Sequence, residues 1–250
     1  MANPFRTKLG KGVPIGTWLM SGAPATAEAL GHAGFDFLVV DMEHVPVDTP
    51  EAVDLLRAIG NTPSVPVVRI PWNDPIWIKR VMDAGGETLM VPFVQDAAQA
   101  EAAAQAMRYP PAGRRGVAAM HRASRYGADR TYLKTANDRA FLIVQLETPE
   151  AIANLTAIAN VIGVDGLFIG PGDLSAAMGH IGDIGHAAVQ DVLAGAVTTA
   201  RATGLPVGIL APNLDMAKLF LGYGYQFVAI GSDMAMLTSR AADILAAMDR

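Results

Sequence analysis

The chain has 250 residues, of which 51% are hydrophobic, 17% are charged and none is cysteine. This composition can bury a large core, and it excludes disulfide bonds, thiolate metal sites and a cysteine nucleophile. The net charge is -5 and the chain has no run of basic residues, so we expect no nucleic-acid partner. No stretch reaches the roughly 18 apolar residues of a membrane span, so we expect no membrane partner and a cytoplasmic location.

Short apolar and β-branched runs recur along the chain, and each is followed by a longer helical pattern. This alternation is typical of parallel βα units, and runs such as 35–41 are almost continuously apolar, as strands buried on both faces are. We therefore predict an α/β fold, a (β/α)8 TIM barrel, built as one domain from residues 1–250, because such barrels have about 250 residues. The predicted strands are 13–18, 35–41, 65–70, 88–91, 140–146, 165–170, 205–210 and 226–231.

Between these strands, apolar residues at spacings of three and four predict the helices of an outer ring. The last predicted helix, 233–248, has an apolar face that includes Leu237 and Ile244. This face packs either on the wall of its own barrel or, if the helix is exchanged, on a second subunit. The predicted helices are 25–33, 51–59, 76–84, 97–107, 149–161, 187–203, 214–221 and 233–248.

An insertion at about 108–139 interrupts the alternation. It contains a turn-rich stretch at 109–116 and a stretch dense in hydrogen-bond donors at 121–130. Long loops in compact domains are commonly functional or mobile. Arg122 and Arg125 could line a substrate pocket, where they would favour an acceptor with a carboxylate, or they could be solvated or paired at a subunit contact. The role of His121 stays open.

Two acidic residues follow neighbouring predicted strands, at the end of the barrel where this fold builds active sites. Glu147 follows the fifth strand and Asp173 follows the sixth. Two oxygen ligands with open positions suit Mg²⁺ or Mn²⁺, and a 2-oxo acid could complete the coordination. The ion would stabilise charge on the keto oxygen. The alternative for each carboxylate alone is a helix cap or a first-turn anion.

Three further residues near strand ends are candidates for proton transfer and anion binding. Arg69 ends the third strand, where a buried guanidinium requires an anion: a substrate oxygen or an internal partner such as Asp41 or Glu43. His44 follows these two acids and is a candidate general acid/base. No lysine falls in a predicted strand, which favours a metal-enolate route over a Schiff base.

Four blocks of the sequence, at 34–44, 67–71, 145–151 and 163–175, resemble the HpcH/HpaI aldolases, which are metal-dependent class II pyruvate aldolases. The resemblance implies an aldehyde-lyase that reversibly cleaves 4-hydroxy-2-oxo acids to pyruvate and an aldehyde through a metal-stabilised pyruvate enolate. It also implies a hexamer, a trimer of dimers that exchange the last helix. The glycine at 172 is a departure, because relatives often have alanine there.

The resemblance assigns a role to each candidate residue. Glu147 and Asp173 would bind the divalent ion, Mg²⁺ or Mn²⁺, with Co²⁺ or Zn²⁺ as alternatives. His44 with Asp41 would handle the proton, and Arg69 would stabilise the enolate. The residues expected to bind substrate are Gln145, the amides of Gly172 and Asp173, and, in the acceptor pocket, Trp18, Phe168 and Leu210.

Two other functions are compatible with the same residues. A citramalyl-CoA or malyl-CoA type lyase of the same superfamily shares the pattern at the end of strand six, but it needs a coenzyme A surface, usually with extra basic residues and a longer chain. A catalytically silent barrel that only binds a small acid or a protein is the other alternative. The presence of His44, Arg69, Glu147 and Asp173 together argues against it.

Overall fold

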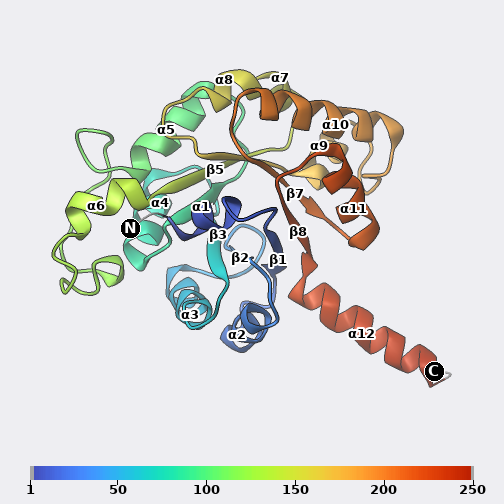
Figure 1. The fold of residues 1–250 in the computed structure, drawn as a ribbon, viewed down its shortest axis with the longest axis horizontal. Helices are drawn as coiled ribbons and strands as arrows, with labels where there is room; N and C mark the ends of the chain where they lie inside the picture. Colours follow the sequence, from blue (N-terminus) through green and yellow to red (C-terminus); the bar gives the residue numbers. More distant parts are fainter. Residues whose placement is uncertain (1–2, 249–250) are drawn as a thin grey trace.

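The computed structural model describes residues 3–248 and contains a closed barrel of eight parallel strands, each paired with its neighbours in chain order (Figure 1). This confirms the predicted TIM-barrel fold, and every predicted strand overlaps an observed one. The single domain predicted for 1–250 stays a prediction, and its first two and last two residues lie outside the described part. The strands are β1 (Ile15–Leu19), β2 (Phe37–Asp41), β3 (Val65–Arg69), β4 (Thr88–Val91), β5 (Phe141–Leu146), β6 (Gly166–Ile169), β7 (Val207–Ala211) and β8 (Phe227–Ser232).

The helices form a ring around the barrel, with the exception of the first and last (Figure 1). None of the helices in residues 3–248 is both long enough and apolar enough to cross a membrane. The helices are α1 (Pro4–Leu9), α2 (Pro24–His32), α3 (Thr49–Ile59), α4 (Pro75–Ala84), α5 (Ala97–Met107), the 3-10 helix η1 (Arg122–Ser124), α6 (Tyr132–Arg139), α7 (Pro149–Ala153), α8 (Leu155–Ala159), α9 (Pro171–Ala177), α10 (Ala187–Ala202), α11 (Leu214–Tyr223) and α12 (Asp233–Ala247).

Three local features differ from the prediction. The helix predicted at 149–161 is divided into α7 and α8 at Asn154, whose side-chain Nδ2 donates to the Gln95 carbonyl oxygen at 2.9 Å. The insertion at 108–139 is partly helical, because α6 buries Tyr132 and Ala136 although its other residues are mostly polar. The short helix α1 was not predicted, since six residues carry too little periodic signal.

Helix α1 closes the amino-terminal end of the barrel. Its Phe5 is fully buried and packs edge-on against the rings of Phe37, Phe141 and Phe227, with ring centroids 5.3 to 5.4 Å apart. Such edge-to-face contacts are the favoured arrangement of aromatic rings. The barrel interior is therefore a packed aromatic core and not a channel, so any cavity must lie at the other end.

Inward-facing residues alternate along each strand, and this alternation positions the polar residues of the site. On β2 and β3, Val39 and Val67 belong to the interior core. The next inward positions toward the carboxyl ends are Asp41 and Arg69, which are register partners on neighbouring strands. Gln145 on β5 follows the inward Ile143 in the same way. One layer of the barrel thus places these polar groups above the apolar interior.

Helix α12 extends from β8 away from the barrel (Figure 1). Its buried residue is Asp233, which accepts hydrogen bonds from the backbone N–H groups of Met20 and Ser21, at 2.7 and 3.2 Å. The apolar face predicted for this helix does not pack on its own barrel wall. Its exposed large hydrophobic residues are Met234, Leu237, Ile244, Leu245 and Met248.

Candidate active site

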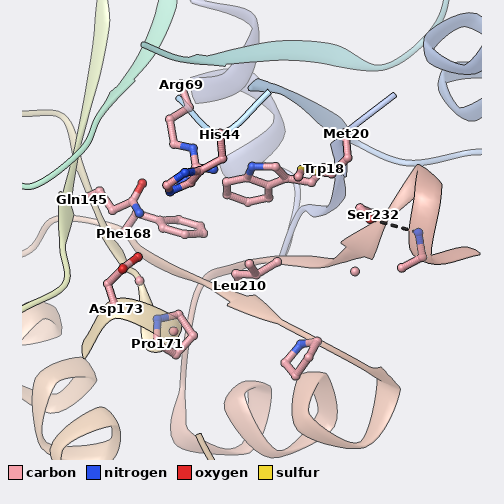
Figure 2. Close-up of a pocket in the computed structure, with 15 residues that line it drawn as sticks. Trp18, Met20, His44, Arg69, Gln145, Phe168, Pro171, Asp173, Leu210 and Ser232 are labelled. Atoms are coloured by element: carbon pink, nitrogen blue, oxygen red, sulfur yellow. Dashed lines mark hydrogen bonds between the residues drawn. The ribbon is translucent and has the colours of Figure 1, made fainter. Parts of the chain in front are cut away.

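A cavity of about 400 Å³ opens at the carboxyl ends of the strands, where the fold was expected to place its site (Figure 2). In Figure 2, His44 and Arg69 lie close together at one end of it, and Asp173 lies beside Gln145 and Phe168. The predicted residues that line the cavity are Trp18, His44, Arg69, Gln145, Phe168, Gly172, Asp173 and Leu210. Asp41 and Glu147 are buried beside it, in contact with Arg69 and Gln145 respectively.

The Arg69 guanidinium is held by two carboxylates. Its Nε and Nη2 donate to Asp41 Oδ1 and Oδ2 at 2.9 and 2.6 Å, which is a two-point contact. Nη1 lies 2.9 Å from Glu43 Oε2, although the direction misses hydrogen-bond geometry. The guanidinium also lies over the Trp18 ring, 5.1 Å from its centroid. The internal ion pair considered from the sequence is therefore present, and it orients a charge that still faces the cavity.

The imidazole of His44 is half-exposed at the cavity mouth, and its nearest carboxylate is Glu43. His44 Nε2 lies 3.9 Å from Glu43 Oε2. Asp41, the partner suggested by the resemblance, instead accepts hydrogen bonds from the backbone N–H groups of Glu43 and His44. Asp41 therefore shapes the turn that carries His44, while Glu43 is the acid beside the ring. Burial raises the pKa of Glu43 to about 7, and the nearby Arg69 opposes this shift.

Glu147 is a carboxyl group removed from water, with 1% of its surface exposed. Its Oε1 accepts a hydrogen bond from the Phe93 backbone N–H at 2.9 Å, and its Oε2 accepts one from Gln145 Nε2 at 2.5 Å. Burial, as the largest cause, raises the pKa of Glu147 to about 7, and the charges of Asp173 and Glu43 raise it further. Asp173 lies beside Gln145, the residue that donates to Glu147 (Figure 2), and the pairing of the two carboxylates on one ion stays a prediction.

Gln145 has one oxygen without a partner beside this carboxylate. Its Nε2 donates to Glu147, whereas Oε1 is buried and has no hydrogen-bond partner. Buried polar atoms are normally satisfied, so an isolated one calls for a ligand, an ion or a water molecule. An ion-bound water or a substrate hydroxyl group would satisfy this oxygen.

The two glycines of the turn from β6 into α9, Gly170 and Gly172, differ in the space around them. A Cβ added at Gly170 would overlap Glu147 Oε2 and would lie 3.0 Å from Gln145 Nε2, whereas one added at Gly172 would meet no atom within 4 Å. No side chain caps α9. The backbone N–H groups of Gly172 and Asp173, in its first turn, therefore have no partner within the helix, and both residues line the cavity.

Glu147, Asp173 and the free oxygen of Gln145 offer oxygen donors alone, the set that Mg²⁺ and Mn²⁺ prefer. Within the described residues, no group of three or more His, Cys, Asp or Glu side chains could hold a metal ion. An ion at this place would therefore be bound by two carboxylates and would keep positions open for water and substrate. A cation between the two carboxylates would favour their charged forms.

Sequence reasoning missed two contributors to the site. Glu43 was considered as a partner for Arg69 and as one of two acids beside His44, but it was assigned no role of its own, because the sequence carries no signal for which way its side chain points. Phe93 provides the backbone N–H that holds Glu147, and its φ of 52° lies in the left-handed region. Nothing in the sequence around 93 indicates this conformation, since neither glycine nor asparagine occupies the position.

The idea that Arg122 and Arg125 line the substrate cavity of their own chain is wrong. Arg122 Nη1 donates to the Ala84 carbonyl oxygen at 2.8 Å, at the end of α4. Both arginines line a separate cavity with Glu87, which directly precedes β4. They thus lie at the amino-terminal end of the barrel, opposite the site described above.

The comparisons with known proteins agree with this geometry. The family model described as HpcH/HpaI aldolase/citrate lyase matches residues 14–239. The chain is 50% identical over 235 residues to a 2-dehydro-3,6-dideoxy-6-sulfogluconate aldolase from Pseudomonas putida, covering 94% of this chain and 92% of the relative. It is 48% identical over 249 residues to a 4-hydroxy-2-oxo-heptane-1,7-dioate aldolase from Escherichia coli, covering 99% and 95%. A crystal structure of an HpcH/HpaI aldolase/citrate lyase family protein from Burkholderia cenocepacia matches with a TM-score of 0.96 and 38% identity, covering all of both chains.

The buried state of Glu147 predicts a pH-dependent difference in stability between the wild type and Glu147→Gln in EDTA. A carboxyl whose pKa rises from 4.5 to about 7 on folding stabilises the fold below pH 4.5, and this contribution is lost as the pH rises through 7. Removing the charge should therefore stabilise the variant relative to the wild type by an amount on the order of 3 kcal/mol more at pH 8 than at pH 4.

Urea unfolding of both proteins across this pH range measures the difference, and every other titrating group is shared by the two. A constant difference between the two proteins at all pH values would show that Glu147 is ionised or solvated in the folded protein.

Proposed function

The chain belongs to the HpcH/HpaI aldolase/citrate lyase family, and we propose that it uses a divalent metal ion to cleave 4-hydroxy-2-oxo acids reversibly to pyruvate and an aldehyde. The relatives named above are aldolases, which are carbon-carbon lyases. The observation that carries the proposal is the buried pair of oxygen donors, Glu147 and Gln145, next to Asp173 at the base of one cavity.

We assign the ion to the carboxylates of Glu147 and Asp173, with Mg²⁺ or Mn²⁺ as the expected ion. Once bound, the ion supplies Lewis-acid stabilisation of negative charge on the keto oxygen of the substrate. Glu147 is fixed for this role by two hydrogen bonds, from Phe93 and Gln145. The side chain of Gln145 has its oxygen free for a water molecule or for the substrate.

The carboxylate of the 2-oxo acid is assigned to the first turn of α9. The N–H groups of Gly172 and Asp173 are free there, and backbone N–H groups at a helix start favour an anion. The Arg69 guanidinium keeps N–H groups that are not directed at Asp41 or Glu43, and it lines the same cavity. Arg69 would donate to the keto oxygen as its negative charge increases.

Proton transfer is assigned to His44. The imidazole would take the proton from the C4 hydroxyl group as the C3–C4 bond breaks and the aldehyde forms. The electron pair of that bond then passes to the three-carbon fragment, and a proton added at C3 completes pyruvate. An imidazole that lines the cavity and lies near Glu43 suits this step, because an imidazole can both accept and donate a proton.

The rings of Trp18 and Phe168 form an apolar wall of the cavity, with centroids 5.6 Å apart. Leu210 continues this wall (Figure 2). We assign the aldehyde half of the substrate to this side, where the apolar wall would keep water from the reacting carbons.

We further propose that α12 packs on a second copy of the chain, in a dimer that exchanges this helix and assembles into a hexamer. Exposed apolar residues on one helix normally mark an interaction surface. An apolar cavity lies where α12 leaves the barrel, and its walls include Phe35, Leu214, Ile230 and Met236. A second copy of α12 has the apolar side chains that would fill it.

The proposed activity predicts pyruvate release from 4-hydroxy-2-oxo acids, measured by coupling to lactate dehydrogenase. Release should require Mg²⁺ or Mn²⁺, stop in EDTA and return when the ion is added in excess. Binding of acetyl-CoA, measured in parallel, tests the alternative of a coenzyme A thioester lyase. Metal-independent cleavage, or no cleavage of several 4-hydroxy-2-oxo acids together with tight acetyl-CoA binding, would contradict the proposal.

The two glycines of the β6–α9 turn provide a matched pair of variants. Gly170→Ala places a methyl group against the Glu147 carboxylate and should weaken Mn²⁺ binding by about ten-fold or more, since a displaced ligand costs at least one hydrogen-bond equivalent. Gly172→Ala meets open space and should bind Mn²⁺ as the wild type does. Calorimetric titration with Mn²⁺ measures both, and equal affinities in the two variants would contradict the ligand assignment of Glu147.

The proposed assembly predicts that charges on the exposed face of α12 separate the subunits. Leu237→Asp combined with Ile244→Asp should give monomers in sedimentation velocity, because the two aspartates cannot be buried without a partner charge. Exposed positions on another side of the same helix, which do not line this cavity, offer the control, Thr238→Asp with Ala242→Asp. Identical assemblies in both variants would rule out an interface on the apolar face.

A further inference from the structure

A second polar cavity lies at the amino-terminal end of the barrel, away from the proposed active site. It has a volume of about 400 Å³, and its walls include Arg122, Arg125, Arg139, Tyr126 and Glu87. A smaller cavity shares Gly85, Glu87 and Arg122 with it and reaches the start of β3 at Val65. The two cavities thus adjoin each other between the insertion and the base of the barrel, and together they are called the hollow below.

Two of the three arginines in this hollow have no acidic partner among residues 3–248. Arg122 donates only to the Ala84 carbonyl oxygen, and Arg125 forms no salt bridge. Arg139 pairs with Asp129 at 3.1 Å and lies 3.8 Å from Glu87, yet its Nε is buried without a hydrogen-bond partner. The hollow therefore contains more positive charge than its own carboxylates neutralise.

The surroundings of Arg122 and Glu87 disfavour the charged forms of both side chains. Burial, followed by the nearby charge of Arg57, lowers the pKa of Arg122. Burial also raises the pKa of Glu87, the one carboxyl among the described residues that line the cavity, and this makes Glu87 a weaker source of negative charge. An anion between the arginines would oppose the shift at Arg122, because it supplies the opposite charge that this guanidinium lacks.

The backbone of the turn that carries Arg122 and Arg125 has an unusual conformation. Arg125 and Tyr126 have φ values of 52° and 55°, which non-glycine residues rarely adopt. Such conformations persist only where the surrounding structure holds them, and they concentrate at ligand-binding sites. Ser124, which precedes them, is buried and donates its hydroxyl to the Ala119 carbonyl oxygen at 2.8 Å. The turn that carries Arg122 and Arg125 is thus held by contacts within the protein.

We propose that this hollow binds a small oxyanion with two negative charges, a phosphate or a dicarboxylate, between Arg122, Arg125 and Arg139. Guanidinium groups bind such ligands with paired hydrogen bonds, and the free Nε of Arg139 adds a donor. This anion site is separate from the proposed active site and does not depend on its chemistry. Arg122 and Arg125 are the two without an acidic partner among residues 3–248, so they should provide most of the affinity.

Calorimetric titration of the full chain with inorganic phosphate, and separately with malonate, tests this site in EDTA. Changing Arg122→Gln together with Arg125→Gln should weaken the binding of at least one probe by roughly ten-fold or more, as expected for lost charge-assisted hydrogen bonds. Arg114→Gln with Arg130→Gln is the control, because it removes the same charge from exposed positions of the same insertion outside the cavity.

Any anion bound in the active-site cavity near Arg69 remains in all three proteins and cancels in the comparison. Equal affinities in the wild type and both double variants would overturn the proposal, as would an equal loss in both variants. If neither probe binds and Arg122→Gln with Arg125→Gln changes only the sedimentation coefficient, the arginines pair with another subunit and the anion site does not exist.

Discussion

The buried charge of Glu147 is the constraint on which the rest of the site depends. A carboxylate removed from water is unstable unless hydrogen bonds and an opposite charge compensate it. Two donors, the Phe93 amide and the Gln145 amide group, compensate it in part, yet its pKa remains raised to about 7. Asp173 contributes a second negative charge, and a divalent cation is the simplest group that would neutralise both carboxylates.

The barrel supplies this environment by ordinary packing rules. Alternation along parallel strands places Arg69 and Gln145 in one inward layer, and Trp18 and Phe168 lie beside them in the cavity wall. Arg69 takes its orientation from Asp41 on the neighbouring strand. The polar groups are therefore fixed before any substrate arrives, which reduces the reorganisation that the reaction requires.

The sequence predicted the features that follow from periodicity and from strand ends. The apolar runs located all eight strands, and the rule that this fold places its site at the carboxyl ends brought His44, Arg69 and Asp173 to one cavity. The features it missed depend on side-chain direction or on long-range packing. Whether Glu43 faces Arg69, whether Phe93 adopts a positive φ, and to which end of the barrel Arg122 folds are all decided by contacts between segments far apart in the chain.

The most direct test of the central claim is a crystal structure with Mn²⁺ and pyruvate, with the ion located by its anomalous scattering. The account predicts one ion that contacts an oxygen of Glu147 and an oxygen of Asp173, with pyruvate bound to it and the pyruvate carboxylate at the start of α9. An ion bound elsewhere, these two carboxylates turned away from each other, or pyruvate joined to a lysine would contradict it.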